Sequence, residues 1–158
     1  MNKVADAGKQ IIKDAESLRL RAYLCPAGKW TIGWGHTGPD VHGDLTITIE
    51  AAENLLTRDL MSAGTAVERL VSIPINDNQY SALVSFVYNF GPNALAISTL
   101  LRMLNAGDFK GASGQFALWN KAHVNGEFVV LNGLTTRRKR ERDLFLTLPE
   151  PTAGDSNG

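Results

Sequence analysis

The chain has 158 residues, of which 44% are hydrophobic and 20% charged, and its 16 basic residues balance its 16 acidic residues. This length suits a single domain with a sizeable core, and the balanced charge excludes the strong global field of a typical nucleic-acid or membrane-surface binder. A single cysteine, Cys25, excludes an intrachain disulfide and indicates synthesis in a reducing compartment.

Neither a secretory signal nor a membrane anchor is expected from the sequence. The first ten residues include Asp6, Lys9 and Gln10, where a signal peptide needs an apolar run. No run of about 18 apolar residues follows elsewhere. We therefore expect the protein to accumulate in the cytoplasm and to need outside help for export.

The N-terminal third combines a helix with short strands. Apolar or small residues at positions 4, 8, 11, 12 and 15 share one helical face and predict a first helix that ends near Glu16. From Leu20 to Trp34, aromatic residues and Ile32 are interrupted by Pro26 and glycines, which predicts a hairpin or a three-stranded sheet. Residues 37–46 are rich in Gly and Asp and predict a loop.

A long amphipathic helix is predicted next. Thr48 is a suitable N-cap, and apolar residues then recur at steps of three and four from Ile49 to Leu70. Gly64 weakens the middle of this helix by roughly 1 kcal/mol relative to alanine and is a place where it can bend.

Shorter helices fill the C-terminal half. Asn76 and Gln79 form a predicted capping box at the start of a helix that Gly91 ends. Ser98 or Thr99 caps a second helix. Further along, the sequence predicts a third helix capped by Asp108, a polar loop at 121–133, a last helix from Thr135 or Thr136 to Phe145, and a flexible tail at 149–158.

These elements predict an α+β fold that is mainly helical. A sheet-bearing lobe at about 16–47 is joined by a connecting helix at 48–72 to a helical lobe at 73–148, on which residues 1–15 pack. A junction between lobes is a favoured place for a substrate cleft.

The segment from Glu16 to His36, ESLRLRAYLCPAGKWTIGWGH, resembles the phage-type lysozymes of glycoside hydrolase family 24. In that family a Glu, a second residue nine positions on and a Thr fifteen positions on face one another across the cleft. Glu16, Cys25 and Thr31 hold these positions here. The resemblance spans roughly 9–147 and includes three further segments: QYSALVSFVYNFG at 79–91, STLLR at 98–102 and GLTTRR at 133–138.

The resemblance implies a lysozyme-like two-lobe fold, with residues 1–148 as a single catalytic domain. It also implies an endolysin that hydrolyses the β-1,4 bond between N-acetylmuramic acid and N-acetylglucosamine in bacterial peptidoglycan, without a cofactor, and so causes host lysis. Glu16 would be the acid, because glycoside cleavage needs a proton on the departing oxygen. The alternative for Glu16 is a solvated residue that ends a helix.

Cys25 stands where much of the family has Asp, although the family includes members with Glu, Cys and Thr. Its position implies a base for water or a nucleophile. A thiol with a reference pKa of about 8.5 is mostly protonated at neutral pH unless a positive neighbour lowers it, and Cys25 is otherwise a small residue in a turn before Pro26. Thr31 offers a hydroxyl that orients water or sugar, or serves β-propensity alone.

The histidines are interpreted as structural or solvent-facing. The resemblance implies that His36 takes part in hydrogen bonding that supports the sheet lobe near the site. His42 and His123 lie in polar segments and are expected to face water. Three scattered His and one Cys lack the spacing of metal ligands, so no metal is expected.

Sugar contacts are assigned to the region that enters the helical lobe. Tyr88 and Asn89 end the helix that approaches the cleft, and an aromatic face with an amide suits hexosamine recognition. Ser98 and Thr99 follow beyond it. Tyr88 is equally suited to core packing.

The basic run at 137–142, RRKRER, opposes the dipole of the helix that it begins. Such a run is usually a solvated face, and it also suggests nucleic-acid binding. The resemblance implies that Arg137 or Arg138 reaches Glu16 or the anionic wall, and Arg137 is included among the substrate-binding residues.

Three functions follow from the sequence. The first is the muramidase just described; the second is a lytic transglycosylase, which can act with a lone Glu; the third is a module that binds the wall or nucleic acid without turnover. The muramidase is the main prediction, with peptidoglycan as partner, no nucleic acid, no stable membrane insertion and a monomeric state. The resemblance further implies residence in the host cytoplasm until a holin-type pore gives access to the periplasm or wall.

Overall fold

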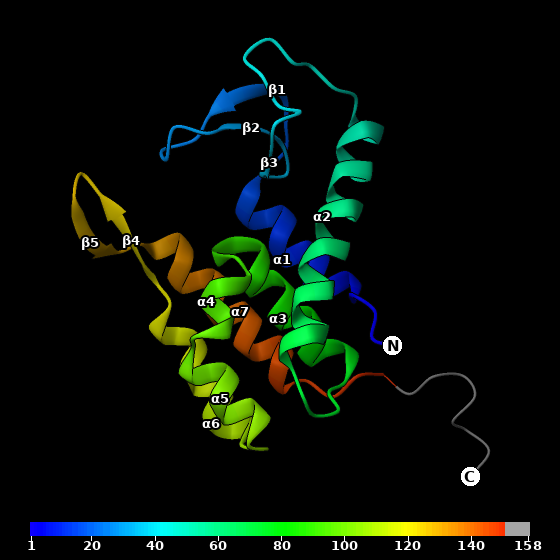
Figure 1. Ribbon diagram of the computed structural model, residues 1–158, viewed down its shortest axis with the longest axis vertical. Coiled ribbons are helices and arrows are strands. Elements are labelled where there is room, and N and C mark those ends of the chain that lie inside the picture. The colour runs from blue at the N-terminus through cyan, green and yellow to red at the C-terminus, as the bar shows by residue number, and fades with distance from the viewer. Residues whose placement is uncertain (151–158) are drawn as a thin grey trace.

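A computed structural model describes residues 1–150, so most of the predicted tail at 149–158 lies outside the described residues. The described part is mainly helical with two small antiparallel sheets, which confirms the predicted α+β class (Figure 1). Its elements in chain order are α1 (Asp6–Glu16), β1 (Arg19–Leu24), β2 (Trp30–Gly33), β3 (His36–Thr37), α2 (Ile49–Leu70), α3 (Asp77–Phe90), α4 (Pro92–Ala96), α5 (Thr99–Asn105), α6 (Phe109–Gln115), the 3-10 turn η1 (Phe116–Leu118), β4 (Lys121–Val124), β5 (Glu127–Val130) and α7 (Asn132–Leu146).

The first sheet has the order β1-β2-β3 and is antiparallel throughout. Tyr23 pairs with Thr31, and Ile32 pairs with His36. Its apolar side forms a small separate core in which Ala22, Ile32 and Val41 pack with Leu55 of α2. Of the two predicted arrangements, a hairpin or a three-stranded sheet, the structure has the three-stranded sheet.

The helix α2 links this sheet to the larger helical part, as Figure 1 shows. It begins where predicted, because the Thr48 side chain accepts a hydrogen bond of 3.0 Å from the backbone N–H of Ala51. Leu55 packs in the small core of the sheet, whereas Leu56 and Leu60 belong to the main core. One helix therefore contributes to both cores.

The helix α3 lies at the centre of the main core. Both bonds of the predicted capping box are formed: Asn76 accepts from the Gln79 N–H at 2.8 Å, and Gln79 accepts from the Asn76 N–H at 2.9 Å. Every residue at 80–87 is buried, as expected for a helix covered on all sides. The surrounding helices are α1, α2 and α7 (Figure 1).

The remaining caps also form as predicted. The Ser98 hydroxyl accepts from the Leu101 N–H at 3.0 Å at the start of α5. The Asp108 carboxylate accepts from the Gly111 N–H at 2.8 Å at the start of α6.

The predicted loop at 121–133 is wrong. Strands β4 and β5 form a hairpin there, and α7 begins at Asn132, ahead of the predicted Thr135 or Thr136. Asn125 and Gly126 join the strands with φ values of 51° and 82°. Positive φ at both positions is what a two-residue Asn-Gly hairpin turn needs. The Asn-Gly pair between the two strands was the signal for this hairpin.

Candidate active site

Glu16 is the last residue of α1 and lies between the sheet and the helical part. Its carboxylate oxygen Oε1 accepts a hydrogen bond from Arg137 Nη1 at 2.9 Å, and its side chain is 24% exposed. Gly35 passes close on the other side: a Cβ added there would lie 2.6 Å from Glu16 Oε2. The carboxylate is therefore confined between the loop that contains Gly35 and a guanidinium.

Arg137 is the arginine that reaches Glu16. It is buried, and α3 holds its guanidinium: Nη2 donates to the Ser85 carbonyl at 3.1 Å, and Nε donates to the Ser85 hydroxyl at 3.3 Å. Arg138 is also buried and donates to Glu141 at 2.6 Å. A solvated face, the usual role of such a basic run, therefore does not apply to these two arginines: Arg137 is held by Glu16 and Ser85 from distant segments, and Arg138 pairs with Glu141 within α7.

A hollow of about 710 Å³ opens beside Glu16. Asn89, Arg137 and Leu131 line it from the helical part, and Pro26 lines it from the sheet side. The Asn89 oxygen Oδ1 is buried and has no hydrogen-bond partner among residues 1–150. The lining of the hollow therefore includes apolar side chains, charged side chains and an amide beside the Glu16 carboxylate.

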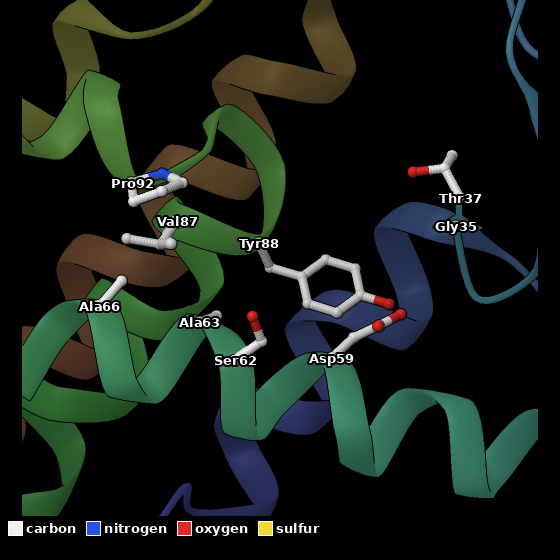
Figure 2. Close-up of a pocket in the computed structure, with 9 residues that line it drawn as sticks. All are labelled: Gly35, Thr37, Asp59, Ser62, Ala63, Ala66, Val87, Tyr88 and Pro92. Carbon is white, nitrogen blue, oxygen red and sulfur yellow. The ribbon is translucent and has the colours of Figure 1, made fainter. Parts of the chain in front are cut away.

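A smaller hollow of about 210 Å³ lies on the Gly35 side (Figure 2). Gly35 and Thr37 of the sheet lobe lie on one side of it, and Ser62 and Asp59 of α2 form its floor, with the Tyr88 ring between the two lobes. The Tyr88 hydroxyl donates to the Trp34 carbonyl at 2.5 Å and so joins α3 to the sheet lobe. Burial raises the pKa of Tyr88, so its hydroxyl remains protonated.

Cys25 lies in the turn between β1 and β2, and Thr31 lies in β2 just after this turn. The Cys25 N–H donates to the Lys29 carbonyl at 2.9 Å, and the Thr31 hydroxyl donates to the same carbonyl at 3.1 Å. The backbone N–H of Lys29 lowers the pKa of the Cys25 thiol; the Ala27 N–H, the Thr31 hydroxyl and the Lys29 charge add to this, while burial opposes it. The turn therefore lowers the pKa of the Cys25 thiol overall. Pro26, the next residue, reaches the hollow beside Glu16.

His36 is held between two carboxylates. Its Nδ1 lies 2.8 Å from Asp59 of α2, and its Nε2 lies 3.0 Å from Asp40 of the following loop. Burial alone would lower the pKa of His36, but the hydrogen bonds to Asp59 and Asp40 and their charges raise it overall. This geometry ties the sheet lobe to α2 and suits a structural role.

The model of the phage lysozyme family matches residues 13–141. The chain belongs to the phage lysozyme family. An endolysin of Acyrthosiphon pisum secondary endosymbiont phage 1 is 44% identical over 142 residues, which are 90% of this chain and 97% of that protein. The endolysin of Salmonella phage P22 is 40% identical over 151 residues, 93% of this chain and 100% of that protein. The muramidase domain of SpmX from Asticaccaulis excentricus superposes with a TM-score of 0.86 at 40% identity and covers 94% of this chain and 100% of its own.

In this phage lysozyme the predicted site residues divide into groups. Glu16, Arg137 and Asn89 line one hollow, and Tyr88 lines the other. Ser98 is buried and caps α5, and neither it nor Thr99 lines either hollow. Sugar contacts by Tyr88, Asn89, Ser98, Thr99 and Arg137 remain a prediction.

Sequence reasoning missed several residues around the site of this lysozyme. Asp59 and Ser85 gave no local signal, because their partners lie on other elements. Glu141 did give one: it follows Arg138 by three residues and Arg137 by four, the spacing at which side chains meet on a helix.

Two further properties of residues 1–150 bear on the chemistry. No group of three or more His, Cys, Asp or Glu side chains in this range is arranged to hold a metal ion. None of its helices is both long and apolar enough to span a bilayer.

Proposed function

We propose that this phage lysozyme is an endolysin that hydrolyses the β-1,4 bond between N-acetylmuramic acid and N-acetylglucosamine in bacterial peptidoglycan. The observation that carries the proposal is the position of Glu16, whose carboxyl opens into a large hollow between the two lobes. The family match over residues 13–141 and the endolysin relatives support the same activity.

In the proposed reaction, protonated Glu16 transfers its proton to the glycosidic oxygen as the bond to the anomeric carbon breaks. Cys25 then acts from the other face of the sugar, either as a base that takes a proton from the attacking water or as a nucleophile that water later displaces. The lowered pKa of its thiol supports either role. Thr31 orients the water or the sugar from beside Cys25.

Loss of the proton donor tests the proposal directly. We expect Glu16→Gln to clear a suspension of purified peptidoglycan on the order of 10³-fold more slowly than the natural chain, within the range for removal of a general acid. Glu53→Gln is the matched control. Glu53 of α2 is exposed and pairs with Lys13 of α1, so this variant should keep full activity. An undiminished rate for Glu16→Gln contradicts the assignment.

Mass spectrometry of the digest separates hydrolysis from the transglycosylase alternative. Hydrolysis adds water and leaves a reducing-end muramic acid, whereas transglycosylation leaves an anhydro sugar. The natural chain and Cys25→Asp should be compared side by side, since a carboxylate at position 25 restores the residue common in the family. If anhydro products dominate for the natural chain, the alternative replaces the hydrolase.

The cellular setting is part of the proposal. The chain acts as a monomer on peptidoglycan in the periplasm or wall, after release from the host cytoplasm through a separate holin-type pore. Its endolysin relatives support the substrate. Lysis of cells that express the chain only when a holin is co-expressed supports this route, and lysis without any holin contradicts it.

A further inference from the structure

A cluster of charges lies buried behind Glu16. Arg138 and Glu141 of α7 are each 0% exposed, and Arg137 is 4% exposed. The Glu141 oxygen Oε1 accepts from Arg138 Nη2 at 2.6 Å and from the Ser85 hydroxyl at 2.8 Å, and it lies 3.4 Å from Arg137 Nε. A single carboxylate oxygen therefore joins both guanidiniums to α3.

Stability alone does not account for this cluster. Removal of each ion from water costs several kcal/mol, and a well-packed apolar set of the same volume is often as stable or more so. The pairing is also incomplete, since Glu141 Oε2 and Arg138 Nε have no hydrogen-bond partner among residues 1–150. Burial opposes the charged form of Glu141, and its contacts with the Arg138 and Arg137 guanidiniums favour that form. Folding stability therefore leaves the charge of this cluster unexplained.

The positive charge of Arg137 lies next to Glu16, the proposed proton donor, and the buried cluster contacts that charge. A general acid must carry its proton until the glycosidic oxygen takes it, and the Arg137 guanidinium lies 2.9 Å from the Glu16 carboxylate. Arg140 of α7 lines the same hollow but is paired with Asp14 of α1 at 2.8 Å. Arg137 is thus the charge in direct contact with Glu16.

The other elements around Glu16 bring little that offsets Arg137. The sheet lobe presents Gly35, which carries no charge. From α3 comes the Tyr88 hydroxyl, which is neutral because burial raises its pKa, and Asp59 of α2 lies beyond it. Glu141 is the carboxylate that lies against the far side of the Arg137 guanidinium.

We infer that Glu141 is a positioning residue for the proposed hydrolysis: its negative charge offsets part of the Arg137 charge, so that Glu16 can hold the proton it donates. Ser85 holds Arg137 in place, because its hydroxyl and its carbonyl both accept hydrogen bonds from the Arg137 guanidinium. Glu141 touches no substrate and acts through Arg137. The inference rests on the proposed function and deepens it.

The test is the pH dependence of activity on purified peptidoglycan at constant ionic strength. Glu141→Gln keeps the shape but removes the negative charge, so Glu16 should ionise at lower pH. We expect the alkaline limb of the profile to move down by on the order of one pH unit. Arg138→Gln removes a positive charge beside Glu141 and should move the limb up. The double variant removes one charge of each sign and should return it toward the natural position.

Asp143→Asn is the matched control. It removes a negative charge from the same helix, but the Asp143 side chain is 56% exposed and pairs with Arg142 at 3.3 Å. Its alkaline limb should stay in place on the same wall preparation. Circular dichroism at each pH verifies that every variant is folded. If Glu141→Gln does not fold, the test rests on Arg138→Gln, whose alkaline limb should move to higher pH.

The outcomes are distinct. Limbs that move in opposite directions and are restored in the double variant support the inference. A folded Glu141→Gln or Arg138→Gln with lower thermal stability but an unmoved limb has lost only a structural contact and overturns it. A natural chain that clears no peptidoglycan at any pH defeats the proposed function itself, whereas an active chain with unmoved variants defeats only the role of Glu141.

Discussion

Cys25 occupies a turn whose backbone stabilises a negative sulfur. The Lys29 N–H lowers the pKa of the thiol, with smaller contributions from the Ala27 N–H, Thr31 and the Lys29 charge. If Cys25 is the base or nucleophile, alkylation by iodoacetamide should reduce peptidoglycan clearance by about 10²-fold or more. Cys25→Ala should show a similar loss.

Cys25→Asp is the control for this experiment, because it lacks a thiol and should keep its activity in the presence of the reagent. Loss of activity in that variant would mean that the reagent acts elsewhere. Undiminished turnover by Cys25→Ala would leave Cys25 as a small residue in a turn and end the hypothesis.

Position 35 lies too close to the Glu16 carboxylate to accommodate a side chain. Its φ is +77°, and an added Cβ would lie 2.6 Å from Glu16 Oε2. Gly35→Ala should therefore combine backbone strain of about 1–2 kcal/mol with displacement of the acid, and a shift of about 1 Å is enough to cost roughly 10²-fold in rate. The measurement is peptidoglycan clearance together with thermal unfolding.

Gly107→Ala separates these two effects. Gly107 has a similar φ of +83°, and nothing lies within 4 Å of an added Cβ. It should lose comparable stability but keep its activity. Equal activity losses in both variants would show that strain, and not the contact with Glu16, limits position 35.

At the scale of elements, the sequence predicted what local chemistry decides. Thr48, Asn76, Ser98 and Asp108 all cap helices as expected, because each cap needs only a side chain and an N–H within the next three residues. The β4–β5 hairpin was misread because polarity was weighed above the turn signal of the Asn-Gly pair.

The buried arginines mark the limit of local reasoning. From the sequence alone, Arg137 and Arg138 look like part of a solvated basic face. The partners of Arg137 are Ser85 and Glu16, which lie 52 and 121 residues away in the chain. The resemblance to a known family narrowed the partner of Glu16 to two arginines, and only the packing of α7 against α3 shows which one makes the contact.

The packing of α2 against α3 explains why position 64 is a glycine, which the sequence did not reveal. The Tyr80 hydroxyl of α3 occupies the space in which a side chain at position 64 would begin. Alanine should favour the helix by up to about 1 kcal/mol, but overpacking costs about 1–3 kcal/mol. Gly64→Ala should therefore lower the free energy of unfolding by on the order of 1 kcal/mol, measured by urea denaturation.

Tyr80→Phe provides the background that tests this reason, because it removes the colliding oxygen. In that background Gly64→Ala should become neutral or stabilising. If Gly64→Ala costs the same in the Tyr80→Phe background as in the natural chain, the close contact between α2 and α3 is not its cause.

At the scale of the whole molecule, three contacts hold the two lobes around the site. Arg137 binds Glu16, Tyr88 binds the Trp34 carbonyl, and His36 binds Asp59. Each joins segments at least 23 residues apart. Arg137, Tyr88 and Asp59 all line the hollows. The third contact differs in that the imidazole of His36, which fastens the sheet lobe to α2, titrates near neutral pH. The junction should consequently respond to pH.

The sign of this response follows from His36. Its pKa is raised in the folded protein, since Asp59 and Asp40 outweigh the effect of burial. The stabilisation is therefore fully present below the unfolded value of about 6.5 and is lost as pH rises through the raised pKa. Thermal unfolding between pH 5 and 9 should show stability falling over the upper part of this range.

Asp59→Asn should flatten that fall and lower the free energy of unfolding at pH 5.5 by about 1.5–3 kcal/mol, the size of a hydrogen bond to a charged group. At pH 9, where His36 is neutral in both proteins, the difference should shrink. Asp40→Asn should have a smaller effect, because the Asp40 side chain is 54% exposed and water screens its charge. A loss that is equal at both pH values for Asp59→Asn would mean that the contact with His36 stabilises the junction without its charge.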